Sequence, residues 1–413
     1  MRMKIQIQME DIYKYICCLS IGVYVACAIA FEYMPGTAVF NKLAIYSAFG
    51  IGVLLIILNR SLKINIYAAG LYIMFSYIFL MSFVSGTTYS GSQVVYLYMT
   101  CAILCYVVYY ITYMYPRALT FLIWGHVIGA VFLALEIVFL YGGFSSILEY
   151  ASTSVYKRVG EGIINENVLG LYMGGAVLSI MRIVLKSKKK RLFLLSVLSP
   201  CLLLFTAMVL LTASKKAIIF LVISIFGMLW LNLREVGMAR KIITVIFMGM
   251  MVLVLLQAIK TLPFFQTINT RLDEFMNALT GEDTVSKSDQ TRALFIVEGW
   301  AAFERSPLFG NGTGHSYSLF GTYSHNNFIE LLMNYGIIGF GVYYIPYIIL
   351  IFKLYKRSKL NDINASFFLL YVVIQIVLGF AWVNYYERVV QVIAAAAWGY
   401  VQGCEERRGV YEN

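Results

Sequence analysis

The sequence predicts an all-α polytopic membrane protein that forms a single integral domain over residues 1–413. Two observations predict this fold class: 61% of the residues are hydrophobic, and only 13% are charged. Soluble domains contain about 45–50% apolar and about 25% charged residues. The composition therefore excludes a soluble enzyme, a disordered scaffold and a nucleic-acid-binding domain, and it indicates that the lipid bilayer is the main solvent of the chain.

The hydropathy pattern predicts about twelve membrane-spanning helices. A spanning helix takes about 20 residues, and twelve of them account for the apolar excess. In chain order, the apolar runs lie at 15–31, 38–58, 64–84, 94–114, 119–141, 166–185, 192–212, 216–233, 242–259, 328–352, 363–383 and 388–402. No small-residue cleavage site separates the basic N-terminal segment from the first run, so we expect an uncleaved first helix.

The basic residues predict the orientation of these helices. Short alternate loops carry clusters such as KSKKKR at 186–191 and KLYKRSK at 353–359. The positive-inside rule places these loops and both termini in the cytoplasm, which predicts a multi-pass protein of the cytoplasmic (inner) membrane. Two long segments, 142–165 and 260–327, then lie outside. We expect them to be the non-helical stretches that build a site, with a helix-compatible piece, RALFIVEGWAAFER, in the second.

Several cations oppose this orientation bias and therefore need another explanation. Lys215 and Lys216 lie between two apolar spans with almost no loop, which is costly unless the position is water-filled or paired with an anion. Arg158 precedes a glycine- and asparagine-containing entry into the next helix, where free backbone N–H groups can bind an anion. A guanidinium can hold two phosphate oxygens at once. These positions favour a site for a phosphorylated substrate.

Two of the three histidines fall near the second long segment. His126 lies inside an apolar span, where a hydrogen-bonded structural histidine is expected, and His315 lies in a glycine-rich loop, where an exposed or a catalytic role is open. His325 lies where the next span begins, which places a titratable imidazole at the membrane interface. The polar residues next to it, which we expect to orient the ring or to contribute to the site, are Asn326, Asn327 and Glu330.

Taken together, Arg158, Lys215 and Arg292 are expected to line one extracytoplasmic cavity with His325. Such cations would offset the charge on a departing diphosphate, an effect of about 3–4 kcal/mol for each well-placed donor. An imidazole with a pKa near 6.5 is suited to deprotonate an incoming hydroxyl at neutral pH. The acidic residues of the second segment have no recognisable metal-ligand spacing, so we expect no metal and no cofactor.

Three stretches carry a resemblance to a known family. They are KRVGEGIINENVLG at 157–170, LTASKKAII at 211–219, and the segment 292–339, which contains PLFGNGTGHS and SHNNFIELLMNYGIIG. At these residues the sequence resembles the O-antigen ligase and polymerase family, which includes the polymerases of capsule and exopolysaccharide repeat units. The resemblance extends from about 155 to 352, and the N-terminal helices match the family only in hydropathy.

The resemblance implies a helical membrane glycosyltransferase (GT-C-like) fold with a large extracytoplasmic loop over the site, between helices 9 and 10. It implies metal-independent glycosyl transfer from a sugar chain on a polyprenyl diphosphate. Arg158 and Arg292 match family arginines implicated in diphosphate or glycan binding, and His325 matches the histidine before the late helix. Lys215 and Lys216 stand where the family commonly has Ser-Arg-Gly. Lysine keeps the charge but loses the two-pronged contact of arginine.

Three functions follow as hypotheses. The first is a polymerase of polyprenyl-diphosphate-linked oligosaccharide repeat units, an inverting glycosyltransferase that works with a flippase and a chain-length regulator of the same pathway. The second is a ligase that transfers the finished glycan to a terminal acceptor. The third is a lipid-linked oligosaccharide flippase or transporter, which should have polar residues near mid-span. Here only Glu136 stands well inside an apolar run, which favours an enzyme acting on one side.

Overall fold

The fold is seen in a computed structural model that describes residues 2–34, 36–84, 89–153, 157–187, 189–233, 237–271, 273 and 287–412. These residues form helices and connecting loops, with no strand among them. The prediction of an all-α polytopic membrane protein is therefore confirmed.

Twelve helices coincide with the twelve predicted spans. They are α1 (Arg2–Phe31), α2 (Ala38–Asn59), α3 (Ile66–Val84), α4 (Tyr89–Met114), α5 (Ala118–Leu140), α7 (Glu166–Lys186), α8 (Arg191–Leu211), α9 (Lys215–Asn232), α10 (Met238–Thr261), α14 (Asn327–Ser358), α15 (Ile363–Leu378) and α16 (Arg388–Glu412). Within the described residues, nine helices are long and apolar enough to cross a membrane, and α15 is a shorter apolar helix. The chain is thus a multi-pass membrane protein, while the number of crossings stays a prediction.

The two long segments between spans contain short helices. These are α6 (Phe144–Ser152) in the first segment, and η1 (Pro263–Phe265), α12 (Lys287–Arg305) and α13 (His315–Phe320) in the second. The expectation that residues 142–165 are non-helical is wrong for α6. Its buried residues, Ile147 and Ala151, lie one helical turn apart, so α6 presents an apolar stripe to the protein while its other side stays polar.

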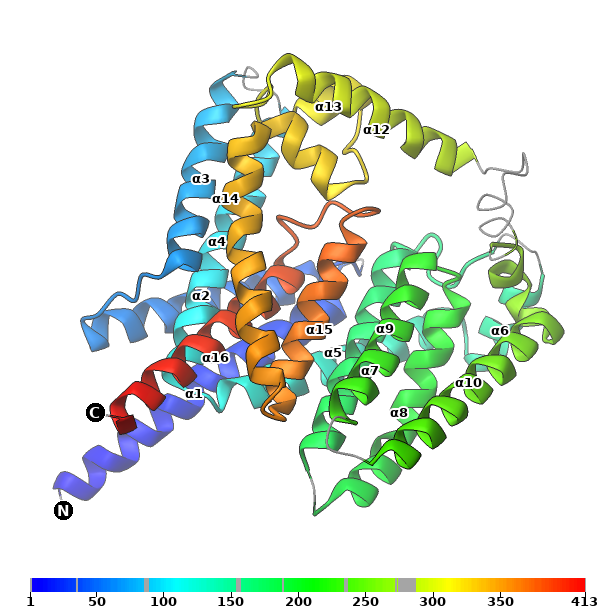
Figure 1. Ribbon diagram of the computed structural model, residues 1–413, viewed down its shortest axis with the longest axis horizontal. Coiled ribbons are helices and arrows are strands. Elements are labelled where there is room, and N and C mark those ends of the chain that lie inside the picture. Colours follow the sequence, from blue (N-terminus) through cyan, green and yellow to red (C-terminus); the bar gives the residue numbers. More distant parts are fainter. Residues whose placement is uncertain are drawn as a thin grey trace.

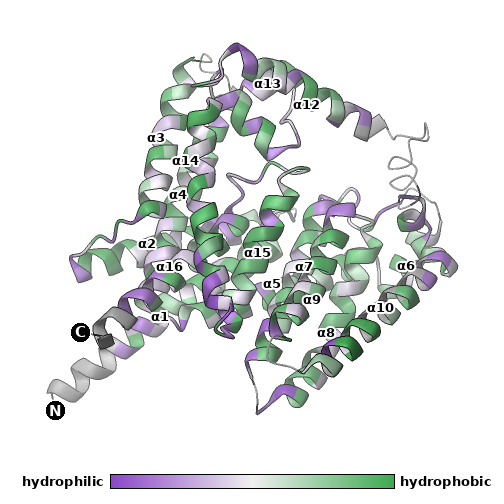
Figure 2. Cartoon of the chain, in the orientation of Figure 1, coloured by the Kyte–Doolittle hydropathy of each residue, from purple (hydrophilic) through white to green (hydrophobic). Residues whose placement is uncertain are grey.

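Helix α12 lies across one end of the helix bundle, above α13 and the starting end of α14 (Figure 1). We call this end the α12 face. Helices α7, α8 and α9 pack together, and α14 packs against α3, α12 and α15. Both chain ends lie at the opposite end of the molecule (Figure 1). Hydrophobic residues dominate the helices, and hydrophilic ones gather on α12 and in the connecting loops (Figure 2), as expected where the bilayer solvates the helices.

A backbone joint fixes α12 to α14. Helix α12 ends at Arg305, as predicted from the Ser306-Pro307 pair that follows it. The next loop then hydrogen-bonds to α14 through its main chain. The bonds run from Asn311 N to Met333 O at 3.0 Å, from Gly312 N to Asn334 O at 3.0 Å, and from Ile337 N to Pro307 O at 2.9 Å. The end of α12 is therefore held at a defined position against α14.

Two glycines make this joint possible. Gly336 has a non-helical backbone inside α14 (φ 59°, ψ −167°), and a Cβ there would lie 2.4 Å from the carbonyl oxygen of Leu308. A Cβ on Gly310 would likewise lie 2.4 Å from the backbone of Asn334. The loop supplies backbone hydrogen bonds that the break in α14 would otherwise leave unmade at the membrane surface.

Candidate active site

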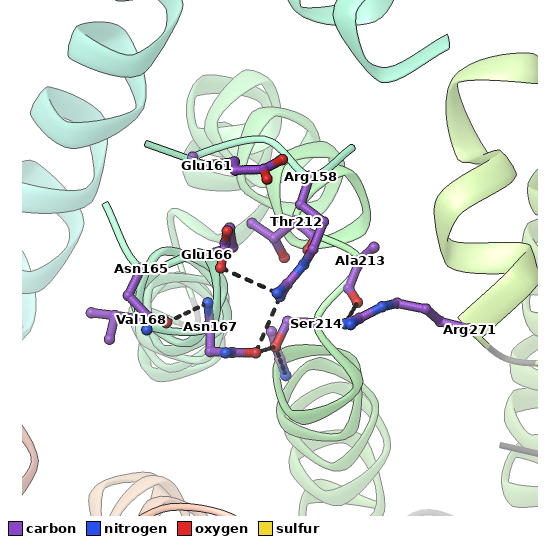
Figure 3. A network of polar contacts seen from close by, with 12 residues as sticks. Arg158, Glu161, Asn165, Glu166, Asn167, Val168, Thr212, Ala213, Ser214 and Arg271 are labelled. Carbon is purple, nitrogen blue, oxygen red and sulfur yellow. Dashed lines mark hydrogen bonds and ion pairs between the residues drawn. The ribbon is translucent and has the colours of Figure 1, made fainter. Parts of the chain in front are cut away.

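Arg158 is held by three contacts in the loop before α7. Its Nε donates to the carbonyl oxygen of Thr212 at 2.8 Å, and its Nη2 donates to Asn167 Oδ1 at 3.2 Å. Its Nη1 lies 3.1 Å from Glu166 Oε2, and the Arg158 side chain is 14% exposed. The guanidinium points into the junction between α7 and the turn that joins α8 to α9 (Figure 3). Arg158 thus keeps a fixed position and a partly exposed charge.

The N-termini of two helices meet at Arg158. Asn165 caps α7 by accepting from the backbone N–H groups of Asn167 and Val168, and Ser214 caps α9. The side chain of Asn167 joins the two ends, because its Oδ1 also accepts from Ser214 Oγ at 2.8 Å. Helix N-termini carry partial positive charge and can bind anions. The local sequence therefore adds two helix dipoles to the charge of Arg158.

The turn between α8 and α9 also holds a second arginine. Ala213 adopts a left-handed backbone (φ 46°), and its carbonyl oxygen accepts from Arg271 Nη1 at 3.3 Å. Figure 3 shows the Arg271 side chain approaching the turn beside Arg158. Sequence reasoning did not select Arg271. Its only signal was a cation in the predicted extracytoplasmic segment, and nothing local predicted its contact with a turn far away in the chain.

Four cations gather here and form what we call the cation cluster: Arg158, Lys216, Arg271 and Arg292. Arg271 and Arg292 act electrostatically on Arg158, and Arg292 and Arg158 act on Lys216. Burial, which disfavours the charged form, is the largest cause that lowers the pKa of Arg158 to about 10. The guanidinium still remains charged at neutral pH, so an excess of positive charge persists on the α12 face.

The sequence prediction that Arg158 and Arg292 come together is matched by this arrangement. Of the two candidate lysines, Lys216 is brought close to both arginines. Lys215 is the first residue of α9, and its side chain is partly exposed. Arg292 reaches the cluster from α12, so the helix that crosses the α12 face contributes directly to the charged site.

His325 lies beside the cation cluster, just before α14. Its ring centroid is 4.3 Å from that of Tyr323, and its ring is parallel to that of Phe295 on α12, with centroids 6.4 Å apart. Burial, followed by the charges of Arg292 and Lys216, lowers the pKa of His325 to about 4. The imidazole is therefore neutral at pH 7 and free to accept a proton.

The backbone of His325 is strained. Its φ of 58° lies in the left-handed region, which a non-glycine residue adopts at a cost of about 1–3 kcal/mol. The neighbouring residues hold it there, because Ser324 and Asn326 are both buried and the Ser324 hydroxyl donates to the carbonyl oxygen of Asn326 at 2.8 Å. Strain of this kind is typical of functional positions.

Asn326 and Asn327 position this segment. Asn326 caps α14, because its Oδ1 accepts from the N–H groups of Phe328 and Ile329. Asn327 binds the loop between α15 and α16: its Oδ1 accepts from the backbone N–H groups of Asn384 and Tyr385. The described contacts of the His325 ring are aromatic, so the expected orientation of the ring by these asparagines finds no support in their hydrogen bonds.

Glu330 is 1% exposed and fastens the loop that leads to His325. It accepts hydrogen bonds from the Ser316 hydroxyl, from Ser324 N at 2.8 Å and from Asn334 Nδ2 at 3.1 Å. Its carboxylate is thus enclosed by α13, the following loop and α14. This enclosure gives Glu330 a structural role, and its expected contribution to the substrate site stays a prediction.

The two other histidines lie apart from this group. His315 is the first residue of α13, and the charge that acts on it is Arg305, at the end of α12 opposite to Arg292. Its Nε2 is buried without a hydrogen-bond partner in the described part of the chain. His126 is buried in α5, and its Nε2 lies 3.2 Å from the carbonyl oxygen of Tyr172, as expected for a structural histidine.

Comparison with known proteins adds one finding to this geometry. A search of curated proteins gives no match to the chain. A sequence model of one family covers a segment that contains Lys216, Arg292 and His325, while Arg158 precedes it. Over residues 200–344 the chain matches the family described as O-antigen ligase, which confirms the resemblance predicted from the sequence.

Proposed function

We propose that the protein polymerises oligosaccharide repeat units linked to polyprenyl diphosphate, as an inverting glycosyltransferase on the extracytoplasmic face of the cytoplasmic membrane. The observation that carries this proposal is the cation cluster beside the neutral imidazole of His325. The family match over residues 200–344 supports a glycan-processing role. The basic loops opposite the α12 face support the orientation, by the positive-inside rule.

In this proposal the cation cluster binds the diphosphate of the donor. Arg158 and Arg292 hold its oxygens, and Lys216 and Arg271 add charge. The bond between the anomeric carbon and the diphosphate breaks, and its electron pair leaves with the diphosphate. Preorganised cations stabilise this growing negative charge, by about 3–4 kcal/mol for each well-placed donor. We propose that these side chains suffice without a divalent metal or cofactor, so transfer should persist in the presence of a chelator.

His325 accepts the proton of the incoming hydroxyl in this scheme. The acceptor is the non-reducing end of a new lipid-linked unit, and its oxygen forms the new bond to the anomeric carbon. The imidazole needs to be unprotonated beforehand, and the lowered pKa of His325 keeps it so. The negative diphosphate then raises the pKa of the ring toward its usual range, which makes it a better base when substrate is bound.

We assign Asn326, Asn327 and Glu330 to positioning, since their contacts hold the segment around His325. Lys215 and His315 remain weaker candidates for contact with the glycan. The lipid tail of the substrate stays in the bilayer, and a flippase is the partner that would deliver it to the outer leaflet. A chain-length regulator is the partner that would end polymerisation.

A complementation experiment tests this function. The gene would be deleted, and Arg292→Ala and His325→Ala variants would be returned separately and compared by glycan gel electrophoresis. Loss of polymerisation predicts single repeats on the cell surface. Lipid-linked units that accumulate on the cytoplasmic side would instead indicate a transporter, and a full-length polymer with His325→Ala would contradict the role of the imidazole.

A ligase is the second candidate, because the matched family is described as O-antigen ligase. A ligase would use the same diphosphate donor and proton acceptor, but its acceptor would be a terminal molecule. The same gel distinguishes the two: loss of a ligase leaves finished long chains attached to polyprenyl diphosphate, whereas loss of a polymerase leaves no long chains.

A further inference from the structure

A second cluster of polar side chains lies on the α12 face, next to the cation cluster. Its one charged member is a carboxylate, opposite in sign to the cations. We call this second cluster the tyrosine wall, and its members are Tyr317, Tyr323, Tyr386 and Glu387. All four side chains are partly exposed. They come from α13, from the loop before α14 and from the loop between α15 and α16.

Side-chain contacts join the members of this wall. Tyr317 and Tyr386 influence each other electrostatically, and Tyr323 packs against the ring of His325. Glu387 Oε2 accepts from the hydroxyl of Tyr33 at 3.3 Å. The wall therefore reaches from the end of α1 to His325, through elements that are far apart in the chain.

The wall also meets the cation cluster. Both Arg292 and Glu387 act electrostatically on Tyr323, so this ring lies near both the positive group and the carboxylate. An inverting displacement needs the attacking hydroxyl and the leaving diphosphate on opposite sides of the anomeric carbon. An acceptor whose hydroxyl reaches His325 therefore also reaches Tyr323, because the ring of Tyr323 contacts that imidazole.

The Glu387 carboxylate is not paired with the neighbouring arginine, so it can accept hydrogen bonds from a ligand. The nearest arginine, Arg388, pairs with Glu32, whose carboxylate also repels Glu387. Burial and this repulsion raise the pKa of Glu387 to about 7, against the opposing effects of Arg388 and Tyr33. A carboxylate in such a position repels a diphosphate but accepts hydrogen bonds from neutral hydroxyls.

Aromatic rings next to a hydrogen-bond acceptor suit a sugar, which presents C–H faces and hydroxyl edges. Tyrosine contributes a large apolar face and a hydroxyl at its end. Sugar binding therefore uses both kinds of group in the wall, whereas a lipid tail would offer the Glu387 carboxylate and the tyrosine hydroxyls no hydrogen bond.

We infer that the tyrosine wall binds the acceptor glycan, with Glu387 accepting from its hydroxyl groups and Tyr323 packing against the sugar next to His325. This inference rests on the proposed function. It deepens that function by separating two sites: a cationic site for the donor diphosphate and a tyrosine–carboxylate site for the acceptor sugar.

Two binding measurements on the purified full-length protein in detergent test the inference. The donor probe is radiolabelled undecaprenyl diphosphate, and the acceptor probe is a one-repeat oligosaccharide released from the cell's own surface glycan. The variants are Glu387→Gln and Tyr323→Ala. The matched control is Glu149→Gln, which changes an exposed carboxylate on α6, outside the wall.

We expect each wall variant to bind the oligosaccharide at least about tenfold more weakly, since a hydrogen bond to a charged group or a packed ring is lost. Their affinity for undecaprenyl diphosphate should stay within about threefold of the wild-type value, which also reports that they fold. Glu149→Gln should match the wild type with both probes.

Unchanged oligosaccharide binding in both wall variants would overturn the inference and leave the proposed function standing. Equal weakening of both probes would also overturn it, because the wall would then serve the donor or the fold as a whole. A wild-type protein that binds neither probe would overturn the inference and the proposed function together.

Discussion

Arginines lie at both ends of the helix bundle, and their surroundings differ. At the end opposite to the α12 face, Arg182 is 3% exposed, and its Nε and Nη2 both donate to Asn364 Oδ1, at 3.0 and 2.7 Å. Arg357 there pairs with Asp362 at 2.9 Å. In the cation cluster, Arg158 has acidic partners but also faces Arg271 and Arg292.

The difference lies in the neighbouring charges: Arg158 is held by the fold like Arg182, but other arginines also act on it. Arg182 and Arg357 have their hydrogen bonds satisfied by partners from the fold, so they join helices. Gathered like charges at partly exposed positions are unfavourable for the protein alone and are relieved by an anion. The following experiments test whether the residues around the cation cluster act on a ligand, whereas Arg182 acts on the fold.

The largest effect is expected at His325. Replacement by alanine should lower turnover by about 100- to 10,000-fold, because the acceptor hydroxyl loses its proton acceptor. Its free energy of unfolding should fall by no more than about 1–2 kcal/mol, because the ring contacts with Tyr323 and Phe295 are lost while the left-handed backbone costs alanine as much as histidine. Glycan gels and thermal unfolding of the same variant test this pair of outcomes, and normal turnover would remove His325 from the chemistry.

The two kinds of arginine should respond in opposite ways. Arg292→Ala should lower turnover by about 100- to 1,000-fold, because it removes a charge that acts on the departing diphosphate, and should lower stability less than Arg182→Ala does. Arg182→Ala should lower stability by about 1–3 kcal/mol, since Asn364 loses two donors, and leave turnover per folded molecule unchanged. The comparison fails if Arg292→Ala unfolds the protein or if Arg182→Ala abolishes transfer.

The adjacent lysines of α9 offer a matched pair. Lys216→Gln should weaken binding of undecaprenyl diphosphate by about tenfold, because Lys216 lies near Arg158 and Arg292. Lys215→Gln removes the same charge one residue away and should have a smaller effect. Radioligand binding measures both, and a larger effect for Lys215→Gln would reassign the lysine of the cluster.

The smallest effect concerns pH. The pKa of His325 is lowered to about 4 in the free protein, and a bound diphosphate should raise it, because a negative charge favours the imidazolium. The complex then takes up a proton between the two pKa values, so affinity for a lipid-linked diphosphate should rise several-fold as pH falls from 7 to 5. Binding curves of the wild type and His325→Gln test this, and identical pH dependence would contradict it.

Local patterns predicted much of this fold. Hydropathy located the helices that coincide with the twelve predicted spans, since lipid solvation demands long apolar runs. Ser306-Pro307 marked the end of α12, and His325 was expected where the next span begins, two residues before the start of α14. Residues 142–165 read as a loop because the apolar stripe of α6 is only two residues wide.

The candidate site was predicted less completely, because contacts across the chain define it. Arg158, Arg292 and His325 stood out as outward-facing polar groups. Arg271 depends on the carbonyl oxygen of Ala213, and Glu387 depends on the loop between α15 and α16. No local pattern reports either contact. The burial of a side chain also distinguishes a site residue from a structural one. Burial depends on tertiary packing, so the sequence alone does not report it.

The joint between the 307–312 loop and α14 is the pivot about which a tilt of α12 would displace Arg292. Arg292 lies thirteen positions before the last residue of α12, which is about 20 Å along the helix axis at 1.5 Å per residue. A tilt of about 5° at the pivot would therefore move Arg292 by about 2 Å, and a misplacement of about 1 Å can lower a rate about 100-fold. Catalytic accuracy on this scale would then be governed by Gly310 and Gly336, the two glycines of the joint.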